Sequence, residues 1–132
     1  MDQGALRSWL DRYGHAWESQ DPGAAAAIFT ADGTYQWGPF NEPIRGREAI
    51  QAAWVYATQG QQKDITFGYE ILAVTADHGI ARWWASMTTT SSGVAVRMEG
   101  IFVIVLDDMG LCCSFREWWN EDPPATGASN YE

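Results

Sequence analysis

One acidic residue, Glu117, falls among aromatic residues near the end of the sequence, in the segment Phe115-Arg116-Glu117-Trp118-Trp119. The segment has the composition of a β-strand, in which successive side chains point to opposite faces. Glu117 then shares one face with Phe115 and Trp119. Because burial disfavours a charged carboxylate, this position predicts a raised pKa and an acid or base that works near neutral pH.

A second interpretation of Glu117 remains open. A bulge or a shift of one residue in the strand register would turn its side chain outward, where Arg97 or Arg116 would pair with it.

The same alternation, applied to the last strand and to the two strands before it, predicts an almost wholly apolar inner face. Its residues are Trp83, Ala85, Met87, Thr89, Met98, Gly100, Phe102, Ile104, Cys113, Phe115, Glu117 and Trp119.

The opposite face of these strands mixes charge with tryptophan. It carries Arg82, Arg97, Glu99 and Arg116 together with Trp84 and Trp118. Exposed tryptophan beside arginine is typical of protein interfaces, so this face predicts a homodimer.

Other catalytic signatures are missing from the sequence. His15 and His78 lack cysteine or carboxylate neighbours at metal-ligand spacing, and Cys112 and Cys113 are adjacent in a strand, which predicts two reduced thiols. No Gly-rich phosphate loop and no Gly-x-Ser-x-Gly motif occurs. We therefore expect no metal and no cofactor.

Composition narrows the class of protein further. The chain has 132 residues, eight tryptophans and a net charge of −9, so we expect one domain with more aromatic side chains than its core needs. The negative charge and scattered cations argue against nucleic acid as a partner. No leader-like segment and no long apolar run is present, which predicts a cytoplasmic protein without a membrane partner.

Hydrophobic periodicity gives the order of the elements. Helices are expected over 3–19 and from about Gly46 to Gly60. Between them, Asp21 is expected to cap a helix that has Pro22 in its first turn and runs through Ala24 to Phe29. A short strand is expected over 34–37, and four long ones over 64–75, 80–90, 94–106 and 111–119. Four strands joined by short turns, with three helices covering one face, predict an α+β roll over 1–122; residues 123–132 are expected to form a flexible tail.

Two segments resemble a known superfamily. Ile28-Phe29-Thr30-Ala31-Asp32-Gly33-Thr34-Tyr35 and Glu42-Pro43-Ile44-Arg45-Gly46-Arg47-Glu48-Ala49-Ile50, with the final aromatic strand, resemble the nuclear transport factor 2-like superfamily and its SnoaL-like branch of polyketide cyclases and ketosteroid isomerases. The resemblance implies a cone-shaped roll, in which three N-terminal helices pack on a curved, mixed but mostly antiparallel sheet around an apolar pocket.

The isomerase and cyclase branches of that superfamily place their catalytic residues at different positions of this sequence. In the isomerase pattern, Tyr13 falls at the position of the oxyanion-hole tyrosine, but Trp37 replaces the carboxylate base and Phe102 the protonated acid, so steroid isomerisation is not expected. In the cyclase pattern, Glu117 falls at the position of a catalytic aspartate.

The sequence thus predicts an enzyme that binds a small hydrophobic molecule, polyketide-, steroid- or terpenoid-like, and acts as an isomerase, cyclase or lyase by acid and base catalysis. Glu117 and Tyr13 are the predicted catalytic residues, and the predicted substrate-binding residues are Trp17, Trp37, Phe40, Trp54, Trp83, Met87, Met98, Phe102, Phe115 and Trp119. The alternative is a non-catalytic module that binds a small ligand or a partner protein.

Overall fold

Two aspartates begin the first two helices. In the computed structural model, which describes residues 1–124, Asp2 accepts a hydrogen bond from the backbone N–H of Ala5 and caps α1 (Gln3–Glu18). Asp21 does the same for Ala24 in α2 (Pro22–Ala27), where Pro22 occupies the first turn. Both helices start where the sequence predicts, but α2 ends at Ala27 and Phe29, its predicted end, already begins a strand. The predicted tail lies almost wholly outside the described residues.

The third helix changes its geometry half-way. The sequence predicts one helix up to Gly60, but α3 (Arg47–Trp54) continues as a π-helical turn, η1 (Val55–Gln59). The Thr58 hydroxyl donates to the Trp54 carbonyl oxygen at 2.7 Å, and this threonine is buried. Such turns change which side chains face inward, and they are frequent at functional sites.

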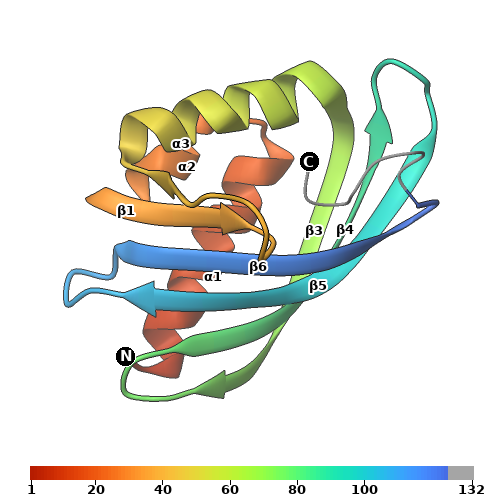
Figure 1. The fold of residues 1–132 in the computed structure, drawn as a ribbon. Helices are drawn as coiled ribbons and strands as arrows, with labels where there is room; N and C mark the ends of the chain where they lie inside the picture. Colours follow the sequence, from red (N-terminus) through yellow and green to blue (C-terminus); the bar gives the residue numbers. More distant parts are fainter. Residues whose placement is uncertain (125–132) are drawn as a thin grey trace.

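Six strands form one curved sheet (Figure 1). Its spatial order is β2-β1-β6-β5-β4-β3, and among the strand pairs of residues 1–124 only β1 and β6 run parallel. The bounds are β1 (Phe29–Trp37), β2 (Ile44–Arg45), β3 (Gln62–Val74), β4 (Gly79–Thr89), β5 (Ala95–Leu106) and β6 (Cys112–Asp122). The mixed, mostly antiparallel sheet is confirmed; β1 is longer than predicted, and β2 was not predicted.

The helices cover one face of the sheet. Figure 1 shows α1 running across the strands, with α2 and α3 side by side near β1. At Gly14 of α1, an added Cβ would lie 2.6 Å from the ring of Phe67, so the absence of a side chain lets α1 approach β3. No helix within residues 1–124 is long and apolar enough to cross a membrane.

The predicted alternation of side chains holds on β4, β5 and most of β6. Trp83 and Phe102 are buried, whereas Trp84 on the other face is 40% exposed. The prediction is wrong for Cys113, because the register shifts where Leu106 pairs with Cys112 and Val105 with Ser114. This bulge buries Cys112 instead. From Phe115 onward the predicted phase is correct.

Candidate functional site

A cavity of about 380 Å³ opens between the helices and the inner face of the sheet. This volume lies within the usual range for small-molecule sites. Its wall combines side chains from α1, β1, the α3–η1 segment and β3 to β6, namely Tyr13, Trp17, Tyr35, Trp37, Trp54, Tyr56, Ala57, Thr58, Gln61, Gln62, Trp83, Met87, Thr89, Val96, Met98, Glu117, Trp119 and Glu121.

Most of the predicted site residues meet in this wall. The structure places Glu117, Tyr13, Trp17, Trp37, Trp54, Trp83, Met87, Met98 and Trp119 there. Three others lie elsewhere. Phe102 and Phe115 are completely buried, because the Tyr13 ring packs against them with centroids 5.2 and 5.3 Å away. Phe40, in the loop after β1, is 87% exposed and does not line the cavity.

Glu117 faces inward, as the alternation predicts. Its side chain is 6% exposed, and the Tyr35 hydroxyl donates to its Oε1 at 3.4 Å. Parallel pairing with Trp37 and a 2.9 Å hydrogen bond from the Gly38 N–H to the Glu117 carbonyl oxygen fix the backbone. Burial raises the pKa of Glu117 from 4.5 to about 8, although the Tyr35 hydrogen bond opposes the rise. Most Glu117 side chains are therefore protonated at pH 7.

A second tyrosine joins Glu117 to Tyr13. The hydroxyls of Tyr13 and Tyr35 lie 3.1 Å apart. Since each hydroxyl has one hydrogen and Tyr35 directs its own to Glu117, Tyr13 donates to Tyr35. Burial is the main cause that raises the pKa of both tyrosines well above 10, so both stay neutral. The hydrogen bonds described within residues 1–124 thus join Tyr13 to Glu117 through Tyr35.

Sequence reasoning missed Tyr35, although a signal for it was present. Tyr35 lies two residues before Trp37, and alternation on β1 puts the two side chains on one face. Their rings are 5.4 Å apart and nearly perpendicular. Applying to β1 the alternation used for the later strands identifies Tyr35 as a wall residue.

The tryptophans of the wall differ in how their indole N–H groups are satisfied. Trp17 donates to Gln62 Oε1 at 2.9 Å. Trp54 and Trp83, which are 3% and 1% exposed, have no acceptor for their buried N–H groups among residues 1–124. A buried donor without an acceptor is unfavourable and rare, so these two N–H groups leave the cavity wall with unused hydrogen-bonding capacity.

Amide groups connect the segments at the rim. The Gln20 side-chain amide donates to the carbonyl oxygens of Thr58 and of Gln62, the latter at 2.6 Å. On β6, the Trp119 N–H donates to Glu121 Oε1 at 3.3 Å. Gln20, which follows α1, thereby links η1 to β3, and the Trp119 contact stays within β6.

The described part of the chain contains no cluster of histidine, cysteine, aspartate or glutamate that could hold a metal ion. His15 and His78 are exposed and lie outside the cavity wall, and Cys112 and Cys113 are free thiols. The cavity wall offers for chemistry the protonated carboxyl group of Glu117, the carboxyl group of Glu121, two coupled tyrosines and tryptophan rings.

A model of the SnoaL-like domain family matches residues 10–114. The chain belongs to the SnoaL-like family. The match ends before Glu117, so the position of this carboxyl group is known from the structure rather than from the family model. A search of curated proteins finds no match to this SnoaL-like protein.

Solved structures share the SnoaL-like fold at low sequence identity. One of them is the epoxide hydrolase/cyclase-like enzyme SalBIII, which has a role in pyran ring formation in polyether salinomycin. It is 18% identical, with a TM-score of 0.77, and the alignment covers 90% of this chain and 93% of SalBIII. RV0760c from Mycobacterium tuberculosis, in complex with estradiol-17beta-hemisuccinate, is 16% identical with a TM-score of 0.73 and coverages of 88% and 94%.

A third structure, a hypothetical protein with a ketosteroid isomerase-like fold from Catenulispora acidiphila DSM 44928 in complex with trimethylamine, is 16% identical. Its TM-score is 0.74, and the alignment covers 83% of each chain. At these identities the likeness establishes the fold: a nuclear transport factor 2-like α+β roll with an aromatic interior.

Proposed function

We propose that this SnoaL-like protein is a cofactor-independent enzyme that binds a small hydrophobic molecule, polyketide-, steroid- or terpenoid-like, and catalyses its cyclisation, isomerisation or dehydration by proton transfer. The observation that carries the proposal is the inward Glu117, whose pKa of about 8 keeps it protonated at pH 7 in an aromatic cavity. A steroid derivative in RV0760c and the cyclase-like activity of SalBIII are consistent with such ligands.

The proposed chemistry uses Glu117 first as an acid and then as a base. Its carboxyl group donates a proton to a substrate oxygen, and the resulting carboxylate recovers one from carbon or from a hydroxyl group. Tyr35 stabilises the carboxylate through its hydrogen bond, and Tyr13 positions Tyr35. The tryptophans of the wall hold the substrate in the reactive shape.

The test separates binding from turnover. A panel of neutral polyketides, steroids and terpenoids is screened by the quenching of tryptophan fluorescence, and each compound that binds is incubated with the enzyme and analysed for products. For a substrate found in this way, Glu117→Gln is expected to lower kcat by about 10²–10⁴-fold. Its dissociation constant should change far less, because glutamine keeps the size of the side chain.

Glu48→Gln is the matched control, because Glu48 is exposed on α3, outside the cavity wall. Full turnover by Glu117→Gln would refute the role of Glu117. Binding without product for the whole panel, with an affinity that does not change between pH 5 and pH 8, would favour the non-catalytic module.

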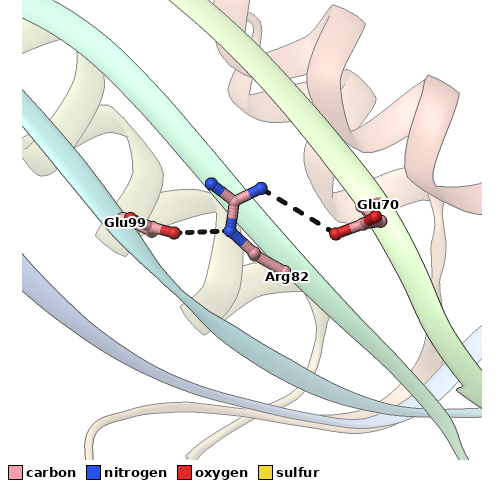
Figure 2. Close-up of polar contacts among 3 residues, drawn as sticks. All are labelled: Glu70, Arg82 and Glu99. Carbon is pink, nitrogen blue, oxygen red and sulfur yellow. Dashed lines mark hydrogen bonds and ion pairs between the residues drawn. The ribbon is translucent and has the colours of Figure 1, made fainter.

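We also propose that two copies associate through the outer face of the sheet. Figure 2 shows Arg82 on this face between Glu70 and Glu99, with an Nη1–Oε1 distance of 3.9 Å to Glu70 and an Nε–Oε2 distance of 2.5 Å to Glu99. The Arg82 guanidinium also lies 4.6 Å from the ring centroid of the exposed Trp84. Sedimentation at micromolar concentration should give a dimer mass, and Trp84→Glu a monomer; a monomeric wild type contradicts the proposal.

A further inference from the structure

The charge of the cavity wall has one sign. The described residues that line it include two carboxyl side chains, Glu117 and Glu121, and no lysine, arginine or histidine. The whole chain has a net charge of −9. A cavity lined in this way concentrates cations and repels anions.

The arginines that could balance this charge are committed elsewhere. Arg82 pairs with Glu70 and Glu99 on the outer face (Figure 2), and Arg97 with Asp122 at 2.6 Å. Within residues 1–124, neither Glu117 nor Glu121 takes part in an ion pair. An ionised Glu117 is therefore without a protein counter-ion.

Aromatic rings surround the same space at steep angles to one another. The interplanar angle is 88° between Tyr13 and Trp54, 75° between Tyr13 and Trp17, and 79° between Tyr35 and Trp37. Rings set in this way turn their faces in several directions. The negative ring faces of tryptophan and tyrosine attract cations, and cages of such rings bind alkylated ammonium groups.

We propose that the cavity prefers ligands with a positively charged, alkylated nitrogen, held between the Glu117 carboxylate and the tryptophan rings of the wall. This inference rests on the function proposed above, because it uses the same cavity and the same carboxyl group; with a cationic ligand bound, Glu117 enters the proton transfer as the base rather than as the acid. It adds the charge of the ligand, which that proposal leaves open.

Binding of such a cation is coupled to the proton on Glu117. Since the ligand charge favours the carboxylate, its binding below pH 8 releases the proton, and the affinity rises with pH. The groups that face Glu117 are Tyr35 and Trp37 from β1, Phe102 from β5 and, through Tyr35, Tyr13 from α1. The two tyrosines stay neutral in this range, and Glu121 on β6 lines the same cavity.

The experiment compares two probes of one shape. Benzyltrimethylammonium carries a fixed charge at every pH, and neopentylbenzene replaces its nitrogen with carbon. At pH 8 the cation is expected to bind the full chain at least about tenfold more tightly, as judged by ligand-observed NMR. Between pH 7 and pH 6 its affinity should fall by about tenfold, because the ionised fraction of Glu117 falls by that factor. The affinity for neopentylbenzene should not change.

Variants assign the effect to Glu117. Glu117→Gln should remove the pH dependence and most of the preference for charge, whereas Glu48→Gln, which removes the same charge from an exposed position on α3 outside the cavity, should keep both. Equal affinities for the two probes, or a preference that survives in Glu117→Gln, would overturn the inference. If neutral panel compounds still bind and react, the proposed enzyme function stands; if no probe and no panel compound binds, both proposals fail.

Discussion

Replacing Glu117 with glutamine should change how the stability of the protein depends on pH. The folded protein keeps the Glu117 proton up to about pH 8, whereas the unfolded chain loses it near pH 4.5. Between these values the folded state binds more protons, so the free energy of unfolding of the wild type falls as the pH rises. Glutamine carries no titratable proton and lacks this slope.

The size of the effect follows from the interval between the two pKa values. One pKa unit corresponds to about 1.4 kcal/mol, so over the two units from pH 5 to pH 7 the variant should gain at most about 3 kcal/mol relative to the wild type. Other titrating groups are common to both proteins, so their contributions cancel in the difference. The measurement is urea denaturation at several pH values, followed by tryptophan fluorescence.

For Glu48→Gln, the free energy of unfolding should depend on pH as it does in the wild type, because Glu48 is exposed on α3. If the free energy of unfolding of Glu117→Gln also had the same pH dependence as that of the wild type, Glu117 would titrate as it does in water. The assignment of a raised pKa, and the acid role built on it, would then be wrong.

Three further substitutions test neighbouring features by the same denaturation assay. Tyr35→Phe removes the hydroxyl that stabilises the Glu117 carboxylate, so the pKa of Glu117 should rise by about one unit. The fall of the unfolding free energy with pH should then extend to higher pH. An unchanged pH dependence would argue against the 3.4 Å contact. Gly100→Ala places a Cβ 1.8 Å from the Trp118 carbonyl oxygen and should lower stability by about 3 kcal/mol or more, whereas Gly60→Ala, with nothing within 4 Å, should be nearly neutral. Asp21→Ala removes the cap of α2 and should cost about 1 kcal/mol; no loss would mean that the cap is dispensable.

The inner face of the long strands could be predicted because one face is buried. Alternation then fixes every second side chain, and Glu117, Trp83 and Met87 follow from it. Cys113 was misplaced because a bulge breaks the period, and no residue type in the segment marks a bulge. Phe40 was misplaced because alternation does not apply to the loop after β1.

Contacts between distant segments were harder to predict. The pairing of Tyr35 with Glu117 depends on the parallel alignment of β1 with β6, which local patterns do not specify. The inward position of Thr58 depends on a π-helical turn, whereas the sequence favours a continuous helix. Phe102 and Phe115 have the right face but lie too deep, because their depth is set by the Tyr13 ring above them.

The parallel pairing of β1 with β6 also determines when the site can assemble during synthesis. Tyr35 and Glu117 are 82 residues apart, so the carboxyl group meets its hydroxyl partner only after nearly the whole domain has left the ribosome. Contacts of such long sequence separation form slowly. Until the last strand docks, the nascent chain exposes tryptophans that later line the cavity, and binding by chaperones should be strongest in that interval.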